Sequence, residues 1–482
     1  MSRRFIAVAL LAASLGIAAV ADAQRPARRA LPRIRVHESG RFLVTEGGRP
    51  FFYLGDTAWE LFHRLTREEA VRYLQLRADQ GYTAIQAVVL AELDGLTVPN
   101  AYGDLPLVER DPTRPAVTPG SAPSDAAAYD YWDHVDYIVN EAERRGLYVA
   151  MLPTWGRWVI NPRGPADVVF DERNAEAYGR FIGARFASRP ILWVLGGDRV
   201  TDGVEHVWRA MARGIAIGVA GREDYARVTM TFHPCGACTS STAFHGDAWL
   251  DFNMHQTGHG LGAPTRSWAR IAADYARTPV KPVIDGEPLY EDHPLAFRAA
   301  ENGWSFDAHV RQRAYWAVFA GAAGHTYGNH AVWQMYAPGR PPINGPQMYS
   351  YQAIHRPGAA QIPLVRRLIE SRDVLSRVPD QSLVVDTLAG ADHIQATRGA
   401  GYAFVYSAQG RAFDVVMGKV SGDSVVAQWF NPRSGDRLPI GRFANAGTRR
   451  FTPPSEGFGA DWVLILDDAS RRRSAAGFPQ RR

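Results

Sequence analysis

Short apolar runs recur along the chain, and each one ends in polar or aromatic residues. The eight runs are 51–59, 83–90, 147–155, 191–198, 227–234, 251–258, 282–288 and 321–329. Stretches with apolar residues at helical spacing follow most of them, at 67–80, 129–145, 174–185, 203–218, 268–277 and 306–320. A strand followed by a helix, repeated eight times, is typical of a (β/α)8 TIM barrel. The pattern therefore predicts an α/β fold of this kind over residues 34–375, entered through a short hairpin at 34–44.

The pattern changes near Ser376, after a helical stretch at 361–371 that we expect to connect two domains. Short β-rich runs then alternate with turns, at 383–386, 393–398, 402–408, 413–419, 425–435, 450–454 and 461–466. Such runs predict a small all-β sandwich domain at 376–470. This domain is either a structural support or a carbohydrate binder. Residues 471–482 are expected to form a disordered tail.

The N-terminus has the features of a signal peptide at residues 1–23. Arg3 and Arg4 precede an apolar run, and Ala21-Asp22-Ala23 provides a cleavage site. A linker rich in Pro, Arg and Ala follows at 24–33. We expect the protein to be exported to a periplasm or beyond, and no other stretch is apolar enough to span a membrane.

Composition excludes some classes of partner. The chain has 482 residues, of which 46% are hydrophobic and 21% charged, so it is globular. Its net charge of +5 forms no basic block outside the termini, which argues against nucleic acid as a partner. Thirteen Trp and nineteen Tyr suit a carbohydrate ligand, although aromatic cores also use such residues.

The predicted strand ends carry the candidate site, because barrel enzymes place their chemistry at the C-terminal ends of the strands. Asp56, Trp59, Glu92 and Asp94 are expected to form one wall, and Trp155 and Trp333 are candidate stacking platforms. The complete set of predicted substrate-binding residues is Asp56, Trp59, Gln86, Glu92, Asp94, Trp155, His233, His255, Gln256, Tyr290, His325 and Trp333.

Two strand ends carry carboxylates in the same local pattern, an apolar run followed by glycine and an acidic residue. These are Asp198 in ILWVLGGD and Glu287 in PVIDGEP, on the fourth and seventh strands. Glycoside hydrolysis requires such a pair. We predict that Glu287 attacks the anomeric carbon and that Asp198, protonated at the start, is the acid and then the base. The alternatives are an Asp198 that caps a turn or pairs with Arg199, and an Asp285 that competes for the nucleophile role.

Histidine and cysteine patterns do not indicate a metal or another cofactor. His233, His255 and His325 form no H-x-H or H-E-x-x-H motif, so hydroxyl binding is favoured over metal ligation. Cys235 and Cys238 form one C-x-x-C, which is weak evidence for zinc. In an exported chain the two either form a local disulfide or remain free thiols.

The motifs together resemble a known family. GDTAWELFHRL, AELDGL, LPTWG, WVLGGD, DFNMHQTGHG, DGEPLYEDHP and YWAVFAGAAGHTYGNHAVWQ occur in the order seen in apiosidase-like proteins, the barrel enzymes of glycoside hydrolase family 140 and relatives. The resemblance covers nearly the whole mature chain, including a C-terminal β domain of the type labelled collagen-binding. It implies β-apiosidase activity on the pectin rhamnogalacturonan II, with the family's catalytic Asp at Asp198 and Glu at Glu287. The cysteines after FHP depart from the family pattern and affect the expected sugar specificity.

Other functions remain open from the sequence. One is a secreted carbohydrate-binding or adhesion protein with an inactive barrel, and another is a glycosidase for a different sugar. A histidine-dependent metal hydrolase and a collagen peptidase are less favoured, since the chain has no nucleophile elbow and no zincin motif. The sequence does not specify the linkage, endo or exo action, protein partners or oligomeric state.

Overall fold

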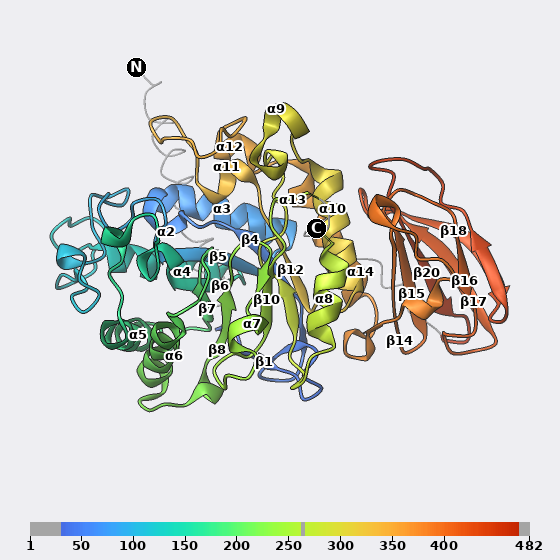
Figure 1. The fold of residues 1–482 in the computed structure, drawn as a ribbon, viewed down its shortest axis with the longest axis horizontal. Coiled ribbons are helices and arrows are strands. Elements are labelled where there is room, and N and C mark those ends of the chain that lie inside the picture. The colour runs from blue at the N-terminus through green and yellow to red at the C-terminus, as the bar shows by residue number, and fades with distance from the viewer. Residues whose placement is uncertain (1–29, 262–265, 472–482) are drawn as a thin grey trace, which may run out of the picture. The chain divides into compact units, whose positions relative to one another are not determined.

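The computed structural model describes residues 30–261 and 266–471. The predicted signal peptide, most of the predicted linker and all but the first residue of the predicted tail lie outside these residues. Figure 1 shows the fold, with the elements labelled in chain order. Within the described residues, no helix is both long and apolar enough to cross a membrane.

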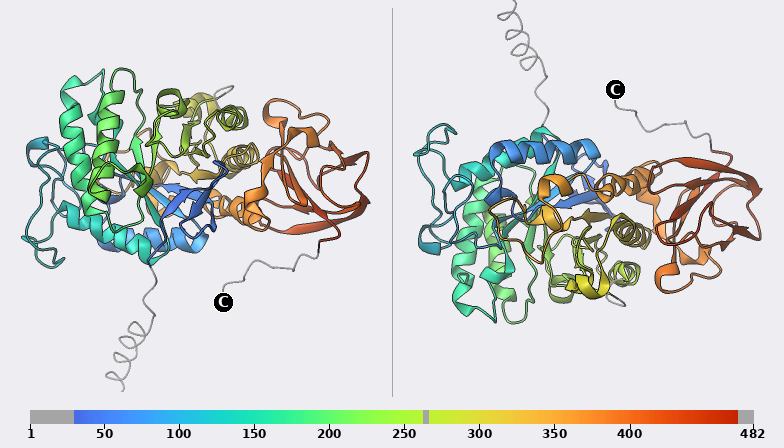
Figure 2. Two further views of the ribbon diagram at one scale, coloured as in Figure 1. Left: turned by 90° about the horizontal axis from the view of Figure 1, so that it is seen from below. Right: turned by 90° about the horizontal axis from the view of Figure 1, so that it is seen from above.

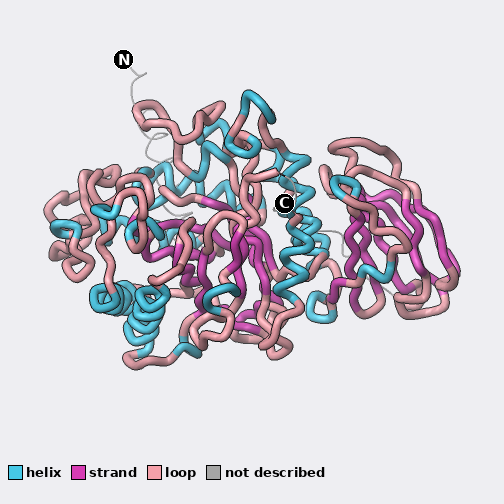
Figure 3. The backbone as a smooth tube through the Cα atoms, viewed as in Figure 1, coloured by secondary structure: helices cyan, strands magenta, loops and turns pink. Residues whose placement is uncertain are grey.

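The larger domain is a barrel of eight parallel strands, as the sequence predicts. They are β4 (Tyr53–Thr57), β5 (Ala84–Leu90), β6 (Tyr148–Thr154), β7 (Leu192–Gly196), β8 (Thr229–His233), β10 (Asn253–Gln256), β11 (Val283–Asp285) and β12 (Gly324–Tyr327). Each lies inside one of the eight predicted runs. All of their residues are buried. Helices cover the outside of the barrel (Figure 3), and side chains fill the inside of such a barrel.

The barrel is nearly closed between β8 and β10. The backbone N–H of Asp251 donates to Met230 O over 2.8 Å, and the Thr231 hydroxyl donates to Phe252 O over 2.6 Å. A short extra strand, β9 (Cys238–Thr239), pairs antiparallel with β10 at the C-terminal end of the barrel. The predicted N-terminal hairpin forms strands β1 (Ile34–Val36) and β2 (Leu43–Thr45). Strand β3 (Pro50–Phe51) pairs with β2 and completes a three-stranded sheet.

Helices follow the strands where their periodicity predicts them. They are α3 (Arg67–Gln80), α4 (Tyr131–Arg144), α5 (Glu172–Arg185), α6 (Glu205–Ala220), α8 (Ser267–Tyr275) and α10 (Asp307–Phe319). Thr66 caps the start of α3 in a capping box: its hydroxyl accepts from the Glu69 backbone N–H, and its own backbone N–H donates to the Glu69 carboxylate. Left-handed Gly81 caps the end of the helix. Figure 2 shows α5 and α6 side by side on the outside of the barrel. Between β8 and β10 the chain forms β9 and the short helix α7 (Ser241–Phe244) in place of a long covering helix.

The C-terminal residues form an all-antiparallel β domain with two sheets. The larger sheet has the order β13 (Val378–Pro379), β14 (Ile394–Gly399), β15 (Tyr402–Ser407), β20 (Trp462–Asp468), β17 (Ser424–Phe430) and β18 (Arg437–Ala444). The smaller sheet pairs β16 (Phe413–Val416) with β19 (Thr448–Phe451). Buried residues from both sheets, such as Val415, Trp429 and Leu464, form one hydrophobic core.

Details of this domain differ from the sequence prediction, and the two-residue strand β13 lies outside every predicted run. The run at 383–386 forms no strand and contributes only an isolated bridge between Val384 and Val415. Strand β18 is not predicted, because Pro439 and Gly441 interrupt it and most of its residues are exposed. An edge strand tolerates both residues, since one of its sides needs no hydrogen-bond partners.

The barrel and the C-terminal domain share a buried ion pair. Arg311 of α10 lies 2.9 Å from Asp461, and the side chains are 1% and 2% exposed. Beside them the rings of Tyr315 and Tyr406 stack with centroids 4.9 Å apart. Helix α14 (Pro363–Glu370) is the element that joins the two domains in sequence.

Replacing Arg311 by methionine is expected to lower the free energy of unfolding by about 3 kcal/mol, because Asp461 is left buried without its main partner. Urea unfolding measures the change. The same substitution at Arg298, whose pair with Glu301 is exposed, should cost about 0.5 kcal/mol or less. Equal losses at the two positions would contradict a role for burial.

Candidate active site

A cavity of about 340 Å³ lies at the C-terminal ends of the barrel strands. Eight of the residues predicted from the sequence line it, namely Trp59, Glu92, Trp155, Asp198, Gln256, Glu287, Tyr290 and Trp333. The other lining residues include Gly236, Ala237, His259, His293, Phe297 and Asn344. The barrel therefore brings both predicted catalytic carboxylates and four tryptophan or tyrosine rings to one site.

Asp198 reaches the cavity through an unusual backbone. Gly196, Gly197 and Asp198 have φ angles of 93°, 122° and 57°, so the chain turns sharply at the end of β7. A Cβ at Gly197 would lie 2.6 Å from the Trp155 ring, so only glycine fits between the turn and this aromatic wall. Left-handed backbone at a residue other than glycine is uncommon and concentrates at functional sites.

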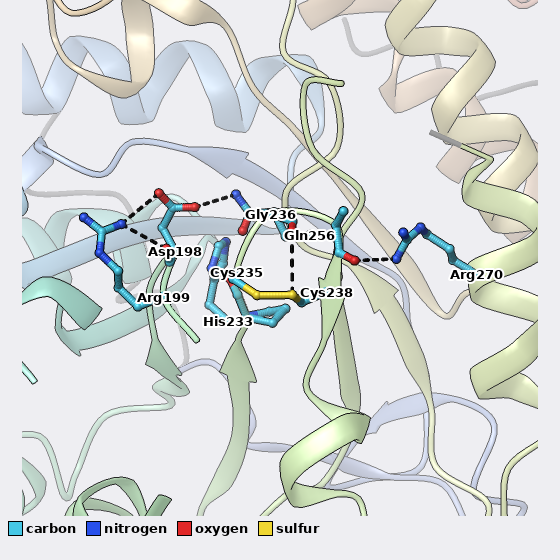
Figure 4. Close-up of a disulfide and its surroundings, with 10 residues drawn as sticks. Asp198, Arg199, His233, Cys235, Gly236, Cys238, Gln256 and Arg270 are labelled. Carbon is cyan, nitrogen blue, oxygen red and sulfur yellow. Dashed lines mark hydrogen bonds and ion pairs between the residues drawn. A yellow bond between two sulfur atoms is a disulfide. The ribbon is translucent and has the colours of Figure 1, made fainter. Parts of the chain in front are cut away.

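The Asp198 carboxyl has two side-chain partners (Figure 4). Gln256 Nε2 donates to Oδ1 over 3.0 Å, and Arg199 Nη1 lies 3.3 Å from Oδ2. Burial in the cavity and the negative charge of Glu287 raise the pKa of Asp198, and Gln256 and Arg199 oppose this rise without cancelling it. Asp198 is thereby favoured in the protonated form needed for a general acid.

Glu287 has the opposite environment. Its Oε2 lies 3.0 Å from His233 Nε2, and its Oε1 lies 3.1 Å from His259 Nε2. Burial alone would raise the pKa of Glu287, but the hydrogen bonds and charge of the two histidines outweigh burial and hold it well below its ordinary value. Glu287 thus remains ionised, as a nucleophile or base must be.

The backbone around Glu287 explains how it enters the site. Strand β11 ends at Asp285, and a Cβ at Gly286 would lie 2.4 Å from Met254 Sδ. Glycine there lets the chain pass close to β10 and turn Glu287 into the cavity. The indole N–H of Trp59 donates to the Tyr290 hydroxyl over 3.2 Å, and Tyr290 and Glu287 line the same cavity.

Glu92 is a third carboxyl in the cavity. Burial, and then the charge of Asp198, raise the pKa of Glu92 to about 8. It is therefore largely protonated near neutral pH and can donate a hydrogen bond to a hydroxylated ligand. Its backbone carbonyl accepts from Arg157 over 3.0 Å, which fixes the segment that carries it.

Several residues predicted to bind substrate do not line the cavity. Asp56 points from β4 to α3, where it pairs with Arg77 over 2.6 Å, and His255 points from β10 to Asp274 of α8 over 2.9 Å. Gln86 is buried inside the barrel and donates to Gly286 O over 2.9 Å. His325 is also buried, and Asp94 is at the surface, 3.7 Å from Arg157. His233 contacts Glu287 and is fully buried, so it positions Glu287 without lining the cavity itself.

The other acidic residues near Glu287 have structural partners. Asp285 accepts from the Thr257 hydroxyl over 2.9 Å, so the alternative in which it replaces Glu287 is not favoured. Glu291 accepts from the Tyr327 hydroxyl over 2.6 Å. Asp292 pairs with Arg356 over 2.8 Å. None of these three carboxylates lines the cavity.

Sequence reasoning missed two histidines in the site, His259 and His293. Their rings stack with centroids 4.0 Å apart at an interplanar angle of 18°, and His259 also binds Glu287. Both follow strand ends within the motifs DFNMHQTGHG and DGEPLYEDHP, which is the signal that could have identified them. They lie beyond the predicted strands, where periodicity gives no direction for a side chain.

The two cysteines form a disulfide beside the cavity (Figure 4). It closes the loop after β8, and Gly236 and Ala237 within this loop line the cavity. Cys238 pairs with Gln256 across β9 and β10, and Gln256 binds Asp198. The disulfide thus constrains a loop whose Gly236 and Ala237 form part of the cavity wall. Among the described residues, no group of three or more His, Cys, Asp or Glu has a metal-binding arrangement.

Replacing His259 by alanine should move the acid limb of the kcat/KM profile to higher pH by about one unit. The histidine lowers the pKa of Glu287, so its loss lets Glu287 take up a proton at a less acidic pH. A pH–rate profile measures the shift. His355→Ala, outside the cavity, is the control. If the acid limb does not move, His259 does not control the ionisation of Glu287, and the prediction is wrong.

Comparison with known proteins identifies a match for each of the two domains. A family model described as "Apiosidase-like, catalytic domain" matches residues 37–376. A second, described as "Putative collagen-binding domain of a collagenase", matches residues 378–467. No curated protein matches the sequence.

Solved structures also resemble the whole chain. One described as a glycoside hydrolase is 35% identical, with a TM-score of 0.83, and the match covers 92% of this chain and 98% of that chain. A glycoside hydrolase family 5 protein from Bacteroides vulgatus is 34% identical, with a TM-score of 0.84, and the match covers 94% of this chain and 97% of that chain.

Proposed function

Because the chain belongs to the apiosidase-like family and is a glycoside hydrolase, we propose that it is an exported retaining enzyme that uses Asp198 and Glu287 to cleave the pectin rhamnogalacturonan II. The family match and the related glycoside hydrolases provide the reaction class. The catalytic roles, the substrate, the stereochemistry and the export are the parts that we propose.

One observation carries the assignment of the pair. Two carboxyls from the ends of β7 and β11 line the same cavity, and their surroundings shift their pKa values in opposite directions. Acid and base roles are separated in this way in enzymes that use two carboxyl groups. Asp198 is favoured as the acid and Glu287 as the ionised partner.

In the proposed first step, Glu287 attacks the anomeric carbon and forms a covalent bond to the sugar. The bond to the leaving oxygen breaks, and that oxygen takes the proton of Asp198. In the second step Asp198 accepts a proton from water, and the water oxygen attacks the same carbon. The bond to Glu287 then breaks and restores the carboxylate. Two displacements on one carbon give net retention of configuration.

The cavity supports a small sugar as the reacting unit. Its volume of about 340 Å³ lies at the lower end of ligand sites, which span about 300–1,000 Å³. Trp59, Trp155 and Trp333 provide apolar faces for the carbon side of a sugar ring. Gln256 and a protonated Glu92 provide polar groups for its hydroxyls. Apiose itself is proposed from the family alone.

The test is incubation of the mature protein with rhamnogalacturonan II oligosaccharides, beside its Glu287→Gln variant, with detection of new reducing ends and product mass. New ends that expose apiose with the unmodified protein only are expected. No product from either protein would overturn the pectin proposal, and an inactive barrel or another sugar would follow. Proton NMR of the first product anomer tests retention, and initial release of the opposite anomer would overturn it.

Export is tested separately by expressing the full chain in a bacterial host and sequencing the N-terminus of the protein from the periplasm or medium. We expect cleavage after Ala23, so that the mature chain begins at Gln24. An uncleaved protein confined to the cytoplasm would overturn the proposal.

A further inference from the structure

Phe297 is an exposed aromatic residue at the edge of the catalytic cavity. Its side chain lines the cavity, yet 59% of the residue is accessible to solvent. By contrast Trp59 and Trp155, on the cavity wall, are each 2% exposed. Ligand cavities are lined mainly by apolar and aromatic side chains, so a phenyl ring that lines the cavity and is still exposed offers a face that a ligand can cover.

The backbone that presents Phe297 has an uncommon conformation. Ala296 and Phe297 have φ angles of 54° and 62°, in the left-handed region that is unfavourable for residues other than glycine. The segment is held by hydrogen bonds from Ala296 N to His259 O over 2.9 Å and from Leu295 N to Gly303 O over 3.0 Å. Surrounding structure therefore maintains a costly conformation that places a phenyl ring at the cavity edge.

The ring is also fixed by the residues that support Glu287. It meets the His293 ring edge-on at 4.9 Å between centroids, and the His259 ring at 5.8 Å. His259 binds Glu287 over 3.1 Å. Phe297 is thus a preorganised surface at a fixed position relative to the proposed nucleophile, which is the requirement for a binding platform.

We propose that Phe297 is the stacking platform of a second sugar subsite, which binds the carbohydrate unit next to the one held among the tryptophans. The ligand class is an oligosaccharide whose neighbouring ring presents its apolar C–H face to the phenyl group. This inference rests on the proposed function of the cavity as a glycosidase site. It adds that the enzyme recognises at least two linked sugars, and that Phe297 determines the preference for a chain over a single glycoside.

The first measurement is binding, made in the Glu287→Gln background so that no turnover occurs. Calorimetric titration with rhamnogalacturonan II oligosaccharides, and with the methyl glycoside of their terminal sugar, should show tighter binding of the longer ligands. Adding Phe297→Ala should raise Kd for the oligosaccharides about tenfold and leave the methyl glycoside within about twofold. Phe297→Tyr should restore binding, and Phe458→Ala, at an exposed ring of the C-terminal domain, should change nothing.

A direct stacking role for Phe297 is distinguishable from an indirect role through His259. If Phe297→Ala weakens both ligands equally, or moves the acid limb of the pH profile of the active enzyme, Phe297 acts through His259 and the subsite proposal is wrong. If the pectin ligands do not bind, the pectin proposal fails, and the comparison is made with mannan, xylan and arabinan oligosaccharides. If no oligosaccharide binds more tightly than its terminal methyl glycoside, the subsite does not exist.

Discussion

Glu287→Gln is expected to lower kcat by roughly 10⁴-fold or more, because the amide cannot form the glycosyl ester through which we propose the reaction proceeds. Glutamine keeps the size of the side chain and can still contact His233 and His259, so the fold should be preserved. Initial rates on a glycoside substrate measure the loss, and the urea midpoint checks the fold.

Glu287→Ala gives a sharper version of this test. The smaller side chain leaves room for azide, which should restore part of the activity by attacking the anomeric carbon directly. The product is then a glycosyl azide of inverted configuration, because only one displacement has occurred. An azide product of retained configuration would place the nucleophile at another residue.

Asp198→Asn is expected to lower kcat/KM by about 10²–10⁴-fold on natural glycosides, since the leaving oxygen then receives no proton. With aryl glycosides that have acidic leaving groups, the rate of the first step should fall much less in the variant. Loss of the proton from Asp198 stops its acid function, so the unmodified enzyme should lose activity as pH rises through the raised pKa of this carboxyl. The variant should lack that basic limb.

The control for Asp198→Asn is Asp94→Asn. Asp94 is a carboxylate that the sequence also places in the site, but it is at the surface and outside the cavity. Its replacement should leave rates within about twofold, as is usual for surface changes. Equal loss on natural and activated glycosides in Asp198→Asn would show that Asp198 does not protonate the leaving group.

The barrel follows from the sequence because its signals are local. A buried parallel strand is a short apolar run, a covering helix has a period of 3.6 residues, and both signals repeat along the chain. The parallel arrangement then requires all strand ends to meet at one side. Asp198 and Glu287 could be placed together for this reason without knowledge of any contact.

The direction in which a side chain points at the end of a strand depends on the tertiary structure. Asp56 and His255 occur at predicted strand ends, but they face helices α3 and α8, where they form ion pairs with Arg77 and Asp274. Successive side chains on a strand point to opposite faces, so a shift of one residue moves a group from the cavity to the helix layer. A strand that is buried on both faces shows no alternation of apolar and polar residues, so its sequence does not indicate which side chains point into the cavity.

The eight strands, their helices, the separate β domain and the proximity of the two carboxyls follow from patterns along the sequence. The contacts of His233 and His259 with Glu287, the bond between Cys235 and Cys238, and the exposure of Phe297 at the cavity edge are seen only in the folded protein. The reason is physical. Strand and helix periodicity is written in neighbouring residues, whereas protonation, loop direction and exposure depend on groups that folding brings together from distant parts of the chain.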